Sequence, residues 1–214
     1  GGELVVAHDE TIDRVADGSG LICQMTLREL KRYRFNKGDP RYPQATLPTL
    51  AEVFDLLKPT PLCINIELKN SYIDYPGLER AVLRGQGPAD LADVCVELAA
   101  RMGMAHRVLY SSFNHHSLLR VKALDSTAKC GMLYEATMIE PWKYAQAHGM
   151  DAIHPHFSEL LVPSEAQCAH DAGLMVNVWT VNRPEDMQRV LRAGCDILIT
   201  NYPDQALRVR SALS

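Results

Sequence analysis

The chain lacks both a long apolar run and an excess of positive charge. None of its 214 residues belongs to a stretch that approaches the roughly 20 apolar residues of a membrane-spanning helix. Its net charge is −4 at pH 7, whereas a nucleic-acid-binding domain usually presents a basic face. The sequence therefore predicts no transmembrane segment and no nucleic-acid partner. No signal peptide is visible after Gly1, and we expect a cytoplasmic location.

Paired cysteines are also missing. No C-x-x-C pair and no cluster of His and Cys with zinc spacing occurs, which argues against a zinc finger and a dithiol redox site. The six cysteines stand alone, at positions 23, 63, 95, 130, 168 and 195. We expect them to be reduced, buried thiols.

Three common catalytic and nucleotide-binding motifs are absent. The chain contains no G-x-S-x-G nucleophile elbow, no G-x-x-x-x-G-K-[ST] phosphate loop and no G-x-G-x-x-G fingerprint. Their absence disfavours a serine hydrolase of that type, a P-loop nucleotidase and a dinucleotide-binding enzyme.

What the chain has is a repeated alternation of strand and helix patterns. Apolar, strand-like runs are predicted at residues 4–7, 62–67, 107–111, 129–134, 152–154, 174–180 and 196–200. Capping boxes at Thr26 and Thr49, each with Glu three residues later, mark two helix starts. Gly149, Gly173 and Gly194 mark helix ends shortly before an apolar run. Alternation of this kind predicts a mainly parallel sheet.

Two parallel folds fit the alternation, a TIM-type (β/α) barrel and a doubly wound sheet. A doubly wound sheet gathers its chemistry at one switch point, whereas every strand of a barrel can present residues at its C-terminal end. Polar groups here follow strand after strand, which favours the α/β barrel. We expect one domain over residues 1–214, with residues 13–48 resembling an insertion of loops and one helix.

Four residues at predicted strand ends are candidates for chemistry. His8 follows the first run and has a side chain that exchanges protons near neutral pH; a backbone-bonded strand-end His is the alternative. Glu67 and Lys69 share one strand face because they are two residues apart. They form either a site for a metal or an anion, or a structural ion pair. Trp179 either floors a substrate pocket or caps the core.

Several segments together resemble the glycerophosphodiester phosphodiesterase family. They are residues 8–14, 17–20, 26–31, 47–50, 64–69, 111–113, 178–182 and 199–203, which occur in the family's order over essentially the whole chain. Each segment is a weak signal alone, and their order makes the resemblance strong.

The resemblance implies a TIM-type barrel that hydrolyses small-molecule glycerophosphodiesters to glycerol 3-phosphate and an alcohol. It implies a divalent cation, Ca²⁺ or Mg²⁺, with Glu67 as a metal ligand. His8 would be the second of two catalytic histidines and would protonate the leaving group. Lys69 would neutralise the phosphate, and Phe113 and Trp179 would line the pocket.

The chain departs from the family pattern at its front. The family's His-Arg-Gly and Glu-x-Asp segments, which supply the first histidine and two further metal ligands, do not occur in these residues. We therefore expect a barrel without its first one or two strands, whose exposed sheet edges favour pairing into an oligomer. The alternative function is a non-catalytic relative that serves in binding or assembly.

Overall fold

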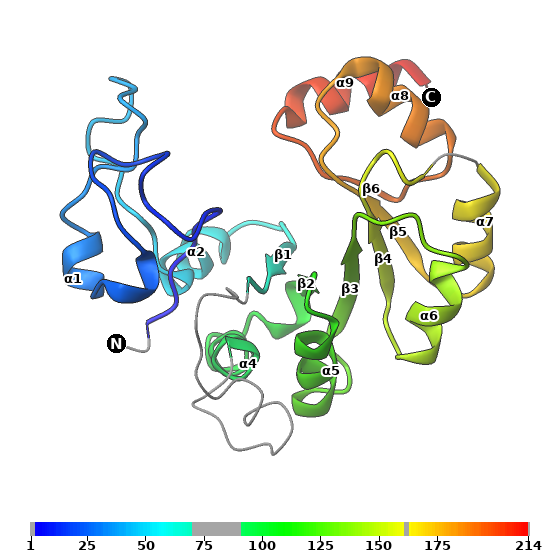
Figure 1. The fold of residues 1–214 in the computed structure, drawn as a ribbon, viewed down its shortest axis with the longest axis horizontal. Coiled ribbons are helices and arrows are strands. Elements are labelled where there is room, and N and C mark those ends of the chain that lie inside the picture. Colours follow the sequence, from blue (N-terminus) through cyan, green and yellow to red (C-terminus); the bar gives the residue numbers. More distant parts are fainter. Residues whose placement is uncertain (1–2, 70–90, 161–162, 214) are drawn as a thin grey trace.

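The computed structural model describes residues 3–69, 91–160 and 163–213 (Figure 1). Its described strands form one parallel sheet in the order β1-β2-β3-β4-β5-β6. The strands are β1 Ile64–Glu67, β2 Val108–Ser112, β3 Lys129–Tyr134, β4 Ala152–Pro155, β5 Met175–Val178 and β6 Ile197–Leu198. The sheet is curled into part of a barrel, and the predicted TIM-type (β/α) barrel architecture is confirmed.

Helices connect the strands in the way a parallel sheet requires. The described helices are η1 Ile22–Gln24, α1 Leu27–Leu30, α2 Leu50–Leu57, α4 Leu91–Arg101, η2 Ala105–Arg107, α5 His115–Leu124, α6 Pro141–Ala147, α7 Pro163–Asp171, α8 Pro184–Arg192 and α9 Pro203–Leu213. The capping boxes at Thr26 and Thr49 are both formed. Gly149, Gly173 and Gly194 have φ values of 66°, 78° and 96°, so each takes the left-handed conformation expected after a helix.

Side chains alternate between the two faces of the sheet, as strand geometry dictates. Cys130 and Met132 of β3, Ile153 of β4 and Val176 of β5 belong to the main hydrophobic core, together with Leu118 of the covering helix α5. All five are 1% exposed or less, and this packing is the largest source of stability in the barrel part. The residues between them, on the opposite face, carry the polar groups of the sheet.

The predicted strand at residues 4–7 is wrong. Only an isolated antiparallel bridge forms there, between Val5 and Thr49, and Val6 is 42% exposed. The segment lies along the start of α2, where Val6 donates a backbone hydrogen bond to Pro48 and Leu50 donates one to Leu4. The apolar run predicted a strand here, but among the described residues the segment has no parallel neighbour with which to form a ladder.

The segment before α2 has a small apolar cluster of its own. Ile12, Leu30 and Leu47 are its buried members, and Tyr33 and Phe35 are among the half-buried side chains around them. In Figure 1 this N-terminal region lies on the β1 side of the sheet, apart from helices α5 to α9. Its separate cluster is compatible with the predicted insertion at residues 13–48.

Burial of the cysteines follows the prediction only in part. Cys95 and Cys130 are buried, and burial raises the pKa of the Cys130 thiol to about 12. Cys23 and Cys63 are exposed, so the prediction is wrong for these two. Cys63 precedes β1, a strand with one described neighbour. Within the described residues no helix combines the length and apolar character needed to cross a membrane.

Candidate active site

Side chains at the C-terminal ends of four strands make up the candidate site. Lys69, Phe113, His156 and Trp179 follow the ends of β1, β2, β4 and β5. Parallel strands all end at the same rim of the sheet, so these side chains gather on one rim although they are far apart in sequence. This is the rim at which barrels of this type carry their active sites.

Glu67 and Lys69 form an ion pair at this rim. Lys69 Nζ lies 3.3 Å from Glu67 Oε1, and their side chains are 40% and 31% exposed. Two hydrogen bonds hold the backbone between them: Leu68 N–H donates to Ser111 O at 2.7 Å, and Ser112 Oγ donates to Leu68 O at 2.7 Å. The predicted shared face is confirmed, and both groups remain accessible to a ligand.

Aromatic rings lie at the same rim as the ion pair. Phe113 meets Trp179 edge-on, with ring centroids 5.3 Å apart and an interplanar angle of 89°. Trp179 also meets the His156 ring edge-on at 4.9 Å. Trp179 Nε1 donates a 2.8 Å hydrogen bond to the carbonyl of His154, which fixes the indole plane. Phe113 is 47% exposed, so the cluster presents apolar surface to solvent rather than closing the core.

A buried polar pair lies one layer below the aromatic rings. Asn177 Nδ2 donates to His154 Nε2 at 2.8 Å, and both side chains are fully buried. Burial lowers the pKa of His154 to about 4, so the imidazole is neutral at pH 7. A Cβ on Gly131 would come within 2.1 Å of the imidazole, so only glycine leaves room for the ring.

Three atoms in this layer have no hydrogen-bond partner among the described residues. They are Ser111 Oγ, His154 Nδ1 and Asn177 Oδ1, on β2, β4 and β5. Unsatisfied polar atoms are costly in a dry interior, so a polar layer of this kind marks the inside of the barrel beneath the rim.

His8 is not at the end of a core strand, which corrects its predicted position. Its side chain is 76% exposed, and its Nδ1 lies 2.6 Å from Asp9 Oδ1. Arg14 Nε donates to the other oxygen of Asp9 at 2.5 Å. Hydrogen bonds from Arg14 and His8 hold the pKa of Asp9 well below its usual range, so the carboxylate is ionised. It accepts a hydrogen bond from the Nδ1–H group of His8. His8 Nε2 is then the nitrogen available for proton transfer.

His8 and the rim residues are not joined by direct contacts. Across residues 3–69, 91–160 and 163–213, no hydrogen bond, ion pair or ring contact links His8 to Glu67, Lys69, Phe113 or Trp179. The structure thus brings together Glu67 with Lys69, and Phe113 with Trp179, while His8 stands in the N-terminal region.

The described residues do not complete a metal site. Glu67 is the one predicted ligand, and its carboxylate is paired with the Lys69 ammonium. In the described ranges no three His, Cys, Asp or Glu side chains converge where an ion would fit. A hard cation such as Ca²⁺ or Mg²⁺ usually takes six or more oxygen ligands, and a single carboxylate does not supply them.

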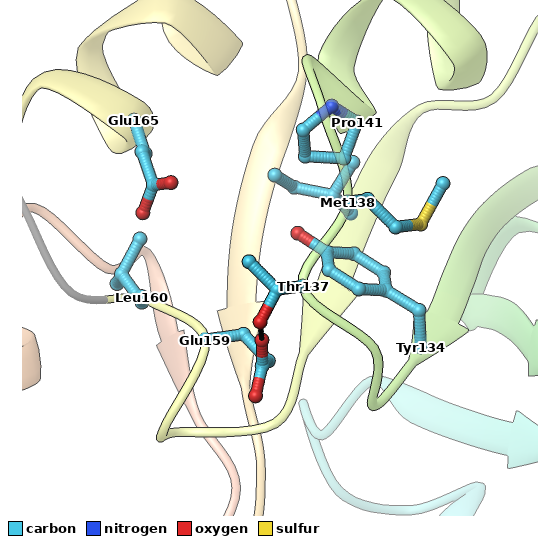
Figure 2. A pocket seen from close by; sticks show the side chains of 8 residues that line it. Tyr134, Thr137, Met138, Pro141, Glu159, Leu160 and Glu165 are labelled. Carbon is cyan, nitrogen blue, oxygen red and sulfur yellow. Dashed lines mark hydrogen bonds between the residues drawn. The ribbon is translucent and has the colours of Figure 1, made fainter.

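A small pocket lies away from the rim cluster, between the segments that follow β3 and β4 (Figure 2). Thr137 Oγ1 donates to Glu159 Oε2 at 2.6 Å across one side of it. Its lining contains none of the predicted site residues: Tyr134, Thr137, Met138, Pro141, Ile153, Glu159, Leu160 and Glu165. Tyr134 and Ile153 point toward the helices, so this pocket is on the outer side of the sheet and we do not place the chemistry there.

Sequence reasoning missed two partners at the site. In a strand, Asp9 would face away from His8; because the segment is no strand, the two side chains turn toward each other. The second partner is His156, whose ring contacts Trp179. The spacing of two residues from His154 on a strand was the available signal, since it places both rings on the same face.

Known proteins with related sequences cover nearly all of this chain. The model of the Glycerophosphoryl diester phosphodiesterase family matches residues 1–205. A glycerophosphodiester phosphodiesterase from Caldanaerobacter subterraneus is 33% identical over 209 residues, which is 97% of this chain and 80% of that protein. YqiK, an uncharacterized protein from Bacillus subtilis, is 31% identical over 96% of this chain and 80% of its own length.

Solved structures agree with these sequence relatives. A phosphodiesterase from Oleispira antarctica, solved in complex with the product sn-glycerol-3-phosphate, superposes with a TM-score of 0.81 at 26% identity. A glycerophosphoryl diester phosphodiesterase structure from Silicibacter pomeroyi gives a TM-score of 0.83 at 22% identity and supports the fold. In both cases 99% of this chain and 80% of the other chain are covered. The chain therefore belongs to the glycerophosphoryl diester phosphodiesterase family.

Proposed function

We propose that this protein hydrolyses glycerophosphodiesters to glycerol 3-phosphate and an alcohol. The observation that carries the proposal is the rim of the sheet, where the Lys69 ammonium, the exposed Phe113 ring and the half-buried Trp179 ring lie just past the ends of β1, β2 and β5. A cation suits the phosphate and an apolar wall suits the carbon skeleton of such a diester. The product bound in the Oleispira antarctica relative has this chemistry.

Each residue has a defined part in the proposed reaction. The oxygen of a water molecule attacks phosphorus and releases one proton to solvent, the bond from phosphorus to the alcohol oxygen breaks, and the leaving oxygen takes a proton from His8, which recovers one from solvent. Lys69 offsets the negative charge that develops on the phosphoryl oxygens. His8, oriented by Asp9, donates the proton to the leaving oxygen from Nε2. Glu67 holds the Lys69 ammonium at the rim.

The family resemblance implies a divalent cation, Ca²⁺ or Mg²⁺, as cofactor. Glu67 is the residue proposed to bind it. One exposed carboxylate paired with a lysine binds a divalent ion weakly, so metal titration of the 214-residue chain is expected to show weak binding. Tight binding would show that the ligand set is larger than Glu67.

Removing the Lys69 ammonium tests the proposed function. Release of glycerol 3-phosphate from glycerophosphodiesters is measured with Ca²⁺, with Mg²⁺ and with neither. The Lys69→Met variant is expected to lose about 100-fold in turnover, because the phosphate charge is no longer offset. Lys143→Met is the matched control, since Lys143 pairs with Glu140 on α6 and is 65% exposed. It should leave turnover unchanged.

The non-catalytic alternative is favoured by one observation, the incomplete metal site in the described part of the chain. It predicts that the protein binds glycerol 3-phosphate without releasing it from any diester. Absence of turnover with every glycerophosphodiester and both cations would overturn the hydrolase proposal and leave this alternative.

A further inference from the structure

We propose that His156 recognises a hydroxyl of the glycerol moiety through Nε2, acting as a hydrogen-bond acceptor held in place by Ser158 and Glu159. The proposal rests on the proposed function and names the residue that would distinguish a glycerol ester from other phosphate esters at this rim. Four features of the structure lead to it.

The first feature is the position of the imidazole. His156 follows β4 and is bridged in parallel to Trp179, which follows β5. Its backbone N–H donates to Tyr134 O at 3.0 Å, and Phe157 N–H donates to Trp179 O at 2.6 Å. The ring therefore extends the rim cluster of Phe113 and Trp179, with its centroid 4.9 Å from that of Trp179.

The second feature is a chain of hydrogen bonds behind the ring. His156 Nδ1 lies 2.8 Å from Ser158 Oγ, and Ser158 Oγ donates to Glu159 Oε1 at 2.9 Å. The other oxygen of Glu159 accepts from Thr137 Oγ1 (Figure 2). Hydrogen bonds from Thr137 and Ser158 lower the pKa of Glu159, so the carboxylate is ionised and can only accept.

The third feature is the tautomer that this chain imposes. A serine hydroxyl has one proton, and Ser158 gives it to Glu159, so Ser158 Oγ must accept from His156 Nδ1–H. The Ser158 backbone N–H donates to Nδ1 in a competing hydrogen bond, but its length is 3.4 Å against 2.8 Å for the contact with the hydroxyl, so the shorter contact sets the tautomer. In the neutral imidazole the proton is then on Nδ1, and Nε2 carries a lone pair.

The fourth feature is the free nitrogen. Among the described residues no group hydrogen-bonds His156 Nε2. A lone pair beside an apolar ring accepts from a hydroxyl, and does not accept from an ionised phosphate, which has no proton to give. The hydroxyl-bearing part of a glycerophosphate fits this nitrogen, while its phosphate fits Lys69.

The loop that carries this chain is anchored from behind. Arg189 of α8 donates through Nη2 to Phe157 O at 2.8 Å and through Nη1 to Leu160 O at 3.1 Å. These bonds fix the backbone on both sides of Ser158 and Glu159, so the acceptor nitrogen is positioned before any ligand arrives.

Binding of two phosphate monoesters tests the proposal. Glycerol 3-phosphate and n-propyl phosphate share a three-carbon chain and a phosphate, and differ in two hydroxyls. Calorimetry should show that His156→Phe, which keeps a ring against Trp179, weakens glycerol 3-phosphate roughly tenfold and leaves n-propyl phosphate unchanged. His106→Phe is the control, since His106 is exposed and lies on η2, before β2, at the other end of the sheet.

Ser158→Ala separates positioning from packing. It keeps the imidazole but removes the acceptor for Nδ1–H, so the preference for glycerol 3-phosphate should fall by a few-fold, and Ser158→Thr should restore it. Nitrogen chemical shifts of His156 should show the proton on Nδ1 in the wild type and a mixture of tautomers in Ser158→Ala.

The outcomes separate the proposal from the function on which it rests. If His156→Phe weakens both esters equally, or neither, His156 does not recognise a hydroxyl and the proposal is overturned, while turnover of glycerophosphodiesters still supports the hydrolase. If the wild type binds neither ester, the proposed function fails and the role of His156 fails with it.

Discussion

The N-terminal region, residues 3–48, and the sheet with its helices, residues 64–69, 91–160 and 163–213, are stabilised in different ways. The sheet part buries its side chains in a large continuous core that joins strands far apart in sequence. The N-terminal region has three buried apolar residues, Ile12, Leu30 and Leu47, and is held together by turns and short helices. The two parts of the candidate site therefore have unequal support, because Lys69 and Trp179 lie just past the ends of β1 and β5, whereas His8 lies in an N-terminal loop.

The largest expected effect comes from shortening one buried side chain in each of the two hydrophobic cores. Met132→Ala in β3 should destabilise the whole barrel part by about 3 kcal/mol, because the side chain is fully buried. Ile12→Ala removes an equally buried side chain, yet its effect should stay local, because its cluster is separate. Hydrogen exchange measured residue by residue distinguishes the two. Equal loss of protection in β2 to β5 from both variants would show one cooperative unit.

Gly131→Ala sharpens the account of the barrel interior. The new Cβ would overlap the His154 ring, so we expect a loss of about 2 kcal/mol in the free energy of unfolding. In a His154→Ala background the same change should cost little, because the obstructing ring is gone. Chemical denaturation of the four proteins gives the coupling. An equal cost in both backgrounds would mean that the imidazole does not occupy the space over Gly131.

Asp151 gives a pH-dependent test of the sheet part. Burial would raise the pKa of Asp151, but hydrogen bonds from Lys122, Lys129 and the Cys130 backbone N–H outweigh burial and lower it. Its stabilising effect is therefore present above the unfolded pKa of about 4 and is lost as pH falls through the lower folded pKa. Asp151→Asn should cost about 2 kcal/mol at pH 7, and this difference should shrink below about pH 4.

The control for Asp151 is an exposed ion pair. Asp204 pairs with Arg208 on α9, and the two side chains are 68% and 79% exposed. Asp204→Asn should change the free energy of unfolding by less than about 1 kcal/mol. Thermal unfolding followed between pH 3 and pH 7 measures both variants. A pH-independent cost for Asp151→Asn would contradict the assigned ionisation.

Hydrophobic periodicity predicted the sheet part because the apolar positions there are the ones that pack into the core. The capping box at Thr49 and the glycine at Gly149 depend on local chemistry, and both formed as predicted. The shared face of Glu67 and Lys69 follows from strand geometry alone, so their ion pair could also be predicted from the sequence. In this part of the chain local pattern and global fold agree.

The same reasoning failed where tertiary context decides. Val5 and Val6 belong to an apolar run typical of a strand, but a strand needs a neighbouring strand, and the sequence pattern does not say which sheet edge is available. The same error hid the pairing of His8 with Asp9, because adjacent residues of a strand face opposite sides. The contact of His156 with Trp179 joins β4 and β5 at the rim, a neighbour relation that depends on sheet order and not on either segment alone.

The most direct test of the hydrolase account joins the two regions in one measurement. His8 lies in the N-terminal region, yet it is assigned the proton that the leaving alcohol takes at the sheet's rim. Release of glycerol 3-phosphate is compared among the wild type, His8→Ala and His106→Ala. The account predicts about a 100-fold loss for His8→Ala with unchanged folding, and no loss for His106→Ala. An undiminished rate for His8→Ala would contradict it.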